Sequence, residues 1–336
     1  MLSALIARSR LEALLAASRG KHVVVIGDAM LDVYLRGDAD RISPEAPVPV
    51  VRVKDRRHAL GGAANVAQNV VALGANATLV AAVGSDMAAG TIRNMLEAIG
   101  ATPAGLVTVN RPTTTKTRVV ARAQQLLRVD EEVDHDLSGT EIETLLQAVA
   151  TALATADALV LEDYNKGVLV PALITAAVAA ARARKIPVIV DPKYRNFFAY
   201  TGATVFKPNR RELEAALGAA VDVDHPASLP AVVERVGAEA LLLTLSERGM
   251  ALIERGAAGG APVHRIPTTA REVYDVVGAG DTVTAYLAAM LAAGASRLEA
   301  AVVANFAAGV EVGKSGAATV SPAEVLEAYD HHHGRA

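Results

Sequence analysis

Short hydrophobic runs alternate with helical spacing along most of the chain. "HVVVIGD" (22–28) is rich in β-branched residues, as buried parallel strands are. "GAANVAQNVVALG" (62–74) has apolar residues three to four positions apart and ends on a glycine, which predicts a helix. Similar strand patterns occur at 77–84, 158–163, 187–193, 203–209 and 240–246. This alternation predicts an α/β fold, a doubly wound and mostly parallel sheet.

Two stretches break this alternation. Residues 33–60 are rich in proline and mixed in charge, and residues 105–132 are rich in threonine, valine and arginine with partial alternation. Both predict antiparallel strands inserted into the α/β core. Two such insertions can pair into a small separate sheet, which would be a lid or a dimer contact.

Polar residues follow most of the predicted strands. In a parallel sheet, ligands bind outside the carboxyl ends of the strands, so these residues are candidates as a group. Carboxylates there can hold sugar hydroxyls, lysine can bind phosphate, and hydroxyls can donate to phosphate. The candidates are Asp28, Asp32, Glu162, Asp163, Lys166, Asp191, Lys193, Asn209, Glu212, Thr244 and Ser246. Turn formation and helix capping would explain several of them equally well.

The stretch "GAGD" (278–281) precedes a clear helical pattern that ends at Gly294. Gly278, Ala279 and Gly280 therefore lie at a helix N-terminus, where unpaired N–H groups and the helix dipole favour an anion. Asp281 would lie in the first turn, either as a functional carboxylate or as an ordinary stabilising charge. The stretch alone leaves both interpretations open.

A second glycine turn occurs near the front of the chain. In "LGGAANVAQN", Gly61 and Gly62 precede a helix and Asn65 lies near its start. The stretch is either an ordinary turn into a helix or a contact for a hydroxylated ligand, and on its own the former is favoured.

The clusters together suit phosphoryl transfer to an alcohol, because they supply carboxylates for hydroxyls and an anion-binding helix end with a carboxylate beside it. No G-x-x-x-x-G-K-[ST] stretch is present, which argues against a P-loop enzyme. No G-x-G-x-x-G follows the first strand, which argues against a dinucleotide-binding dehydrogenase.

Composition excludes several other classes. The chain has 336 residues, no cysteine and a net charge of −3. The charge balance lacks the basic footprint of a nucleic-acid binder, and the missing cysteines exclude disulfides and thiolate chemistry and fit the cytoplasm. No apolar stretch reaches the roughly 20 residues that span a bilayer, so no membrane partner is expected.

The motifs resemble those of a known family. "LGGAANVAQN" and "DVVGAGDTV" are similar to the two signatures of the ribokinase-like (PfkB) carbohydrate kinases, and "KPNRRE" and "TLSERG" match nucleotide-side motifs in order. The similarity covers roughly 20–322. "RISPEAPVPV", "REVYDVVGAGDTV" and "VGKSGAATVS" resemble the subgroup that phosphorylates D-glycero-β-D-manno-heptose 7-phosphate, in the synthesis of the lipopolysaccharide core precursor ADP-heptose.

The resemblance implies a role for each matching residue. Asp281 would be the catalytic base, and Gly278, Ala279 and Gly280 would form the anion hole. ATP would be bound by Asn209, Arg210, Arg211, Glu212, Thr244, Ser246 and Asn305. The sugar would be bound by Asp32, Gly61, Gly62 and Asn65, and Asp28, Asp163 and Lys193 are further candidates for it because they follow predicted strands.

The resemblance also implies ions and an assembly. Glu212 would hold Mg²⁺ through water, and Asp275, with Gly316, corresponds to loops that hold a monovalent cation such as K⁺ in some members. The insertions would form the lid, through which two copies would associate. For the substrate's 7-phosphate the candidates are Lys193, Arg41, Arg52 and Arg118.

Residues 1–336 are expected to form a single kinase domain, with no room for the nucleotidyltransferase domain that is fused to many such kinases. Two alternatives stay open: a PfkB-family kinase for another sugar, sugar phosphate or nucleoside, and a catalytically inactive sugar-binding protein on this fold.

Overall fold

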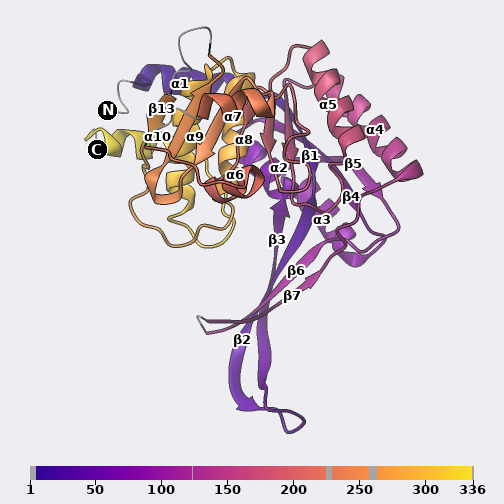
Figure 1. Cartoon of the computed structure of the whole chain (residues 1–336). Coiled ribbons are helices and arrows are strands. Elements are labelled where there is room, and N and C mark those ends of the chain that lie inside the picture. The colour runs from indigo at the N-terminus through magenta and orange to yellow at the C-terminus, as the bar shows by residue number, and fades with distance from the viewer. Residues whose placement is uncertain (1–4, 123, 225–228, 257–262, 335–336) are drawn as a thin grey trace.

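The larger of two sheets carries the site along the carboxyl ends of its parallel strands. The computed structural model describes residues 5–122, 124–224, 229–256 and 263–334. Within them, nine strands pair in the order β13-β12-β11-β10-β9-β8-β1-β4-β5 (Figure 1). The strands are β1 (His22–Gly27), β4 (Asn76–Val83), β5 (Thr102–Thr108), β8 (Ala158–Glu162), β9 (Val188–Asp191), β10 (Val205–Phe206), β11 (Ala240–Thr244), β12 (Met250–Glu254) and β13 (Val263–Ile266).

The sheet is parallel from β5 to β11 and antiparallel only at β12 and β13. β1 pairs with both β4 and β8, so the chain leaves β1 toward one edge and returns toward the other. This is the topological switch point at which doubly wound sheets bind ligands. β1 and β8 approach closely there: a Cβ at Gly27 would lie 2.0 Å from the Glu162 carbonyl oxygen, so only glycine fits. The predicted fold class is confirmed.

Helices cover both faces of this sheet and bury two hydrophobic cores. One face is covered by α1 (Arg8–Ala17), α2 (Ala63–Ala72), α3 (Met87–Ala98), α8 (Ala279–Ala292), α9 (Arg297–Glu311) and α10 (Pro322–His332). The other is covered by α4 (Gly139–Leu153), α5 (Pro171–Ala183), α6 (Arg210–Leu217) and α7 (Leu229–Val236). A short 3₁₀ helix occupies Ser246–Arg248. Within the described residues, no helix combines the length and apolarity that crossing a membrane requires.

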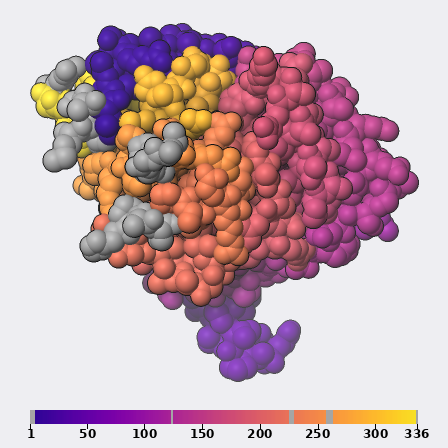
Figure 2. Space-filling model, turned by 45° about the horizontal axis from the view of Figure 1, so that its top comes forward, coloured from indigo at the N-terminus to yellow at the C-terminus, as the bar shows by residue number. Residues whose placement is uncertain are grey.

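A second sheet, here called the lid sheet, has four strands in the order β3-β2-β6-β7. β2 (Ala29–Ile42) and β3 (Pro49–Gly62) form one antiparallel hairpin, and β6 (Thr115–Ala121) and β7 (Gln124–Glu131) form the other. The hairpins join through parallel pairing of β2 with β6. The end of the β2–β3 hairpin stands clear of the body of the molecule (Figures 1 and 2).

The expected start of the second insertion was wrong. Residues 105–108 belong to β5, which pairs in parallel with β4 at the edge of the large sheet. In this second insertion the first strand of the lid sheet is β6, which begins only at Thr115. A short apolar run gives no information about which sheet it joins, because edge strands and inserted strands share the same pattern.

Candidate active site

Asp281 lies at the point where two glycine turns meet. It occupies the first turn of α8 and is 5% exposed. One carboxylate oxygen accepts a 2.7 Å hydrogen bond from the Asn65 amide, and the other accepts a 2.9 Å bond from the Tyr164 hydroxyl. Asn65 lies in the first turn of α2, directly after Gly61 and Gly62. The structure thus brings together the two motifs that were ambiguous when considered separately.

The surroundings of Asp281 favour a carboxyl that can accept a proton near neutral pH. Burial raises its pKa above the ordinary value, because the charged form loses hydration. The hydrogen bonds from Asn65 and Tyr164 oppose this shift, and the carboxylate of Asp191 adds to it. A raised pKa of this kind suits a general base.

Gly278 to Gly280 form an open anion cradle at the start of α8. Gly278 has φ +96°, which a residue with a side chain rarely adopts. The N–H groups of Gly278 and Gly280 have no acceptor in the described part of the chain. Beside Gly280 the nearest groups are the Lys207 ammonium and the Asp191 carboxylate, 3.7 and 3.8 Å from where its Cβ would lie. Unpaired N–H groups and a cation therefore border the same space.

Lys207 is a site residue to which sequence reasoning assigned no role. It is 3% exposed, and its ammonium donates a 2.6 Å hydrogen bond to Asp191. Burial disfavours its charged form, but Asp191 and Glu162 outweigh that effect and raise its pKa. The available signal was its place at the end of a predicted strand in "KPN".

Glu162 adds a third carboxyl to this cluster. Burial, together with the carboxylates of Asp191 and Asp281, raises its pKa well above the ordinary value. One of its oxygens has no hydrogen-bond partner in the part of the chain that the structure describes. Carboxyls this close together cannot all ionise cheaply, and this repulsion adds to burial in raising the pKa of Glu162.

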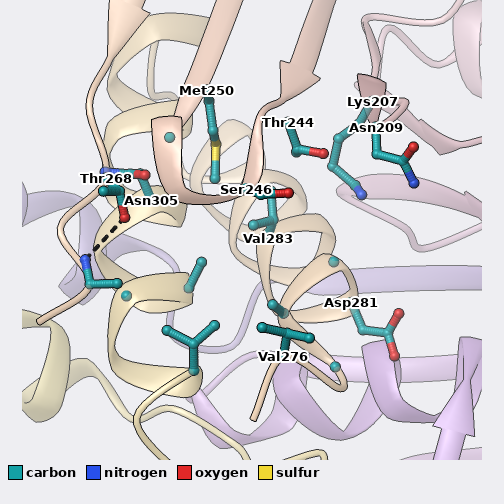
Figure 3. A pocket seen from close by; sticks show the side chains of 18 of the residues that line it. Lys207, Asn209, Thr244, Ser246, Met250, Thr268, Val276, Asp281, Val283 and Asn305 are labelled. Carbon is teal, nitrogen blue, oxygen red and sulfur yellow. Dashed lines mark hydrogen bonds between the residues drawn. The ribbon is translucent and has the colours of Figure 1, made fainter. Parts of the chain in front are cut away.

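A pocket of about 540 Å³ opens from the cradle along the nucleotide side (Figure 3). This volume falls in the range of small-molecule sites. Lys207, Asn209 and Asp281 lie at one end, and Asn305 and Thr268 at the other. The wall contains every predicted ATP residue except Arg210 and Arg211, namely Asn209, Glu212, Thr244, Ser246 and Asn305. The extent of the pocket and the cations at the cradle fit a nucleoside triphosphate with its phosphates at Gly278–Gly280.

Asn209 and Glu212 form the capping box of α6. The Asn209 side chain accepts from the Glu212 N–H, and Glu212 accepts from the Asn209 N–H, each at 2.9 Å. The other Glu212 oxygen is paired with Lys193. Lys193, predicted to bind sugar, therefore lines the nucleotide pocket beside Glu212. Arg210 is paired with Glu214 and lines a separate shallow pocket, and Arg211 is exposed.

Asp32 and the two glycines lie on the other side of Asn65. Asp32 is 5% exposed and is paired with Arg118 of the lid sheet. A Cβ at Gly61 would lie 2.7 Å from the Asp32 carboxylate, so the turn packs directly against it. Arg118, Asp32, the Gly61 turn and Asn65 thus form a chain of neighbouring groups from the lid sheet to Asp281.

Asp28 and Asp163 are placed differently. Asp28 accepts backbone N–H bonds from Tyr164, Lys166 and Val168, and Asp163 accepts from the Tyr200 hydroxyl at 2.7 Å. Neither lines the pocket. Both carboxylates hold the loop that follows β8, and through it the Tyr164 that contacts Asp281.

Asp275 ties two loops beside the cradle. Its carboxylate accepts from the Val277 N–H and from the Gly316 N–H, each at 3.0 Å. Glu311 of α9 is fully buried nearby, and neither of its oxygens has a hydrogen-bond partner of good geometry among the described residues. Burial raises the pKa of Glu311 to about 8, against an opposing effect of the Ala318 N–H.

A doubly wound sheet, an anion cradle at its switch point, and a buried carboxylate between cradle and lid define a phosphoryl-transfer enzyme. A family profile described as pfkB family carbohydrate kinase matches residues 20–324. The chain belongs to this family and is a carbohydrate kinase, and the family implies ATP as the phosphoryl donor.

Curated relatives are named "Bifunctional protein HldE". The protein from Pelobacter propionicus is 49% identical over 328 residues, with 96% of this chain and 66% of that protein covered. The one from Caulobacter vibrioides is 48% identical, with 92% of this chain and 63% of that protein covered. The chain thus spans about two thirds of the length of these relatives.

Solved structures show the same fold. Arabidopsis thaliana ribokinase complexed with ribose and ATP has a TM-score of 0.70 at 21% identity, with 92% of this chain and 98% of that chain covered. Escherichia coli phosphofructokinase-2 in complex with potassium has a TM-score of 0.74 at 20% identity, with 93% and 99% covered. At these identities the likeness concerns the fold.

The Tyr164 contact predicts a shift in pH dependence. Tyr164→Phe removes a hydrogen bond that favours ionised Asp281, so the pKa of Asp281 rises further. A base acts when ionised, so activity is present above its pKa and is lost as pH falls through it. We expect the acidic limb of the pH profile of kcat/KM to move up by roughly half to one pH unit, the effect of one hydrogen bond.

Tyr200→Phe is the control, because it removes a hydroxyl from Asp163 instead, and it should leave the acidic limb in place. An unmoved limb in Tyr164→Phe would exclude Asp281 as the titrating group.

Proposed function

We propose that the chain transfers the γ-phosphoryl group of ATP to the C1 hydroxyl of D-glycero-β-D-manno-heptose 7-phosphate, giving the 1,7-bisphosphate and ADP. The reaction class rests on the cradle beside Asp281. The substrate rests on the sequence motifs of the heptose 7-phosphate kinase subgroup and on relatives named HldE at 43–49% identity. The pathway would be synthesis of ADP-heptose for the lipopolysaccharide core, in the cytoplasm.

The residues have separate tasks in this mechanism. Asp281 accepts the proton of the C1 hydroxyl as that oxygen forms its bond to phosphorus. The N–H groups of Gly278 and Gly280, with the Lys207 ammonium, stabilise negative charge on the transferred group. Asn65 and Tyr164 hold the Asp281 carboxylate in place. ATP, bound with Mg²⁺, supplies the phosphoryl group and carries away the electron pair of the broken bond on ADP.

Mg²⁺ would be held mainly by the phosphates, with Glu212 as its contact to the chain through water. Glu212 lies on the pocket wall and is held in one orientation by the Asn209 N–H and Lys193. A hard carboxylate oxygen at this position fits the ligand preference of Mg²⁺.

Turnover on a sugar panel tests the substrate. We expect phosphorylation of heptose 7-phosphate with kcat/KM at least about a hundredfold above that for fructose 6-phosphate, ribose or adenosine, a difference that several lost polar contacts would produce. A preference for another member of the panel would reject heptose 7-phosphate as the substrate. If ATP is not consumed with any sugar of the panel, an inactive sugar-binding protein is favoured.

Asp281→Asn tests the base in the same assay. It is isosteric, so nucleotide affinity should stay near the wild-type value while turnover falls by about 10²–10⁴-fold. Turnover near the wild-type rate would contradict the assignment.

A monovalent cation is proposed beside the cradle. Asp275 joins the loop that precedes the cradle to the segment that contains Gly316. The carboxylate oxygens of buried Glu311 have no hydrogen-bond partner of good geometry among the described residues. A cation there would neutralise these groups and steady Gly278. We expect K⁺ to raise turnover several-fold over Na⁺ at equal ionic strength, and to lower the pKa of Glu311 because a nearby cation favours the carboxylate. Equal rates in both salts would contradict a K⁺ site.

The lid sheet is proposed to form a homodimer contact. Its β7 strand exposes Leu127 and Val129, and the β2–β3 hairpin exposes Ile42, Val48 and Val53. Exposed apolar groups gathered on one element are typical of interfaces. We expect a dimer by analytical ultracentrifugation that Leu127→Asp converts to monomer. Met87→Asp, at a more exposed apolar residue of α3, is the matched control. A monomeric wild type would reject the contact.

A further inference from the structure

One face of the lid sheet carries three arginines in a single row across all four strands. The pairing register places Arg57 opposite Tyr34, Tyr34 opposite Arg118, and Arg118 opposite Arg128. The Arg118 guanidinium lies over the Tyr34 ring, 5.3 Å from its centroid. Arg57 and Arg118 are two strands apart, about 10 Å between backbones, so their side chains can converge over the tyrosine.

This face is directed toward the active site. Asp32, two positions before Tyr34 and hence on the same face, is buried against the Gly61 turn and paired with Arg118. Burial raises the pKa of the Tyr34 phenol, and the surrounding charges include Arg118, Asp32, Asp275 and Arg57. Asp275 belongs to the loop that precedes the cradle, so its charge acts on Tyr34 from the side of the cradle.

The face is rich in positive charge. In the described residues, five cations surround three carboxylates, an excess of two positive charges: Arg57, Lys116, Arg118, Arg128 and Lys166 against Asp32, Asp130 and Glu132. Arg36 and Asp55 form an opposed pair in the next row. Asp275 adds a negative charge whose effect reaches Tyr34, and both of its oxygens are engaged by backbone N–H groups. Within the described residues, Arg57 has no carboxylate at ion-pair distance.

We propose that the row of Arg57, Tyr34 and Arg118, extended by Arg128, is the subsite for the phosphate monoester of the sugar substrate. The inference rests on the proposed function and assigns the group that distinguishes a sugar phosphate from a sugar. Planar guanidinium forks bind phosphate oxygens in pairs, and the Tyr34 hydroxyl is a further donor between them.

The order of contacts supports the assignment. Asp281 contacts Asn65, Asn65 follows the Gly61–Gly62 turn, the turn packs on Asp32, and Asp32 contacts Arg118. A sugar bound along this path with its reacting hydroxyl at Asp281 would direct its far end toward the row. The cations of this face outnumber its carboxylates, which favours a phosphate anion.

Three other candidate cations lie elsewhere. Lys193 is paired with Glu212 on the nucleotide side. Arg41 pairs with Val50 near the end of the β2–β3 hairpin, and Arg52 forms an ion pair with Asp40 there. Of the four residues considered from sequence, only Arg118 belongs to the row.

Arg57→Gln and Arg56→Gln form a matched test, since adjacent strand residues point to opposite faces. The measured quantity is the ratio of kcat/KM for heptose 7-phosphate to that for the unphosphorylated heptose. Arg57→Gln should lower this ratio by about tenfold or more, the effect of a lost charge-assisted hydrogen bond. Arg56→Gln should keep the wild-type ratio. The mass of each variant in solution is measured alongside.

The outcomes separate the two proposals. If the wild type prefers another sugar phosphate, the heptose assignment fails and the same ratio is measured for that sugar and its unphosphorylated form. A wild type with no preference for the phosphorylated form overturns the subsite, as does an Arg57→Gln ratio equal to that of Arg56→Gln. If Arg57→Gln changes the mass and slows both substrates equally, the row contacts a second copy and the subsite is rejected.

Discussion

The hydrogen bond between Asn65 and Asp281 is the contact on which the site depends. It joins the starts of α2 and α8, two helices whose sequences lie 216 positions apart. Each helix begins at a glycine with positive φ, Gly62 and Gly278, and a Cβ at Gly278 would lie 3.1 Å from the Asn65 amide nitrogen. A carboxylate with 5% exposure needs donors for both oxygens, and Asn65 and Tyr164 supply them. The position of the base is therefore fixed by groups from three elements, none of which can shift without leaving a buried carboxylate unpaired.

Charge balance around this contact explains why the site can accept a polyanion. Asp281, Asp191 and Glu162 lie beside Lys207, and Lys193 is also near Asp191 and Glu162. Such a cluster would repel a phosphate if all three carboxyls were ionised. Burial and mutual repulsion raise the pKa of Glu162, while the ion pair with Asp191 keeps Lys207 charged. The cradle itself consists of backbone N–H groups. Their positive ends attract a phosphate, and they add no negative charge to the site. The resting site is thus less negative than its composition suggests.

Much of this arrangement was predictable from the sequence, and the remainder depended on contacts between distant segments. The alternation of strands and helices gave the sheet, and glycine-rich helix starts located Gly278, Asp281 and Asn65. The sequence carried no information that Tyr164 would reach Asp281, because the loop after β8 is shaped by Asp28 and Asp163. These two carboxylates looked like sugar ligands since they end strands, yet backbone N–H groups and Tyr200 occupy them. Residues 105–108 were misplaced for a related reason, since strand pattern does not specify the partner strand.

The lid sheet shows how strand periodicity lets one element serve two purposes. On β7, Arg128 lies between Leu127 and Val129, so the charged side chain and the apolar pair point to opposite faces. The charged face continues through Arg118 and Tyr34 to Asp32, and hence to the site. The opposite face continues through Val33, which belongs to the hydrophobic core, and Leu35, which packs against it. A one-residue slip in register would exchange the two faces. The bulge between Arg36 and Gly37 lies beyond the arginine row, so the hairpin can bend toward its tip without disturbing the pairs nearest the site.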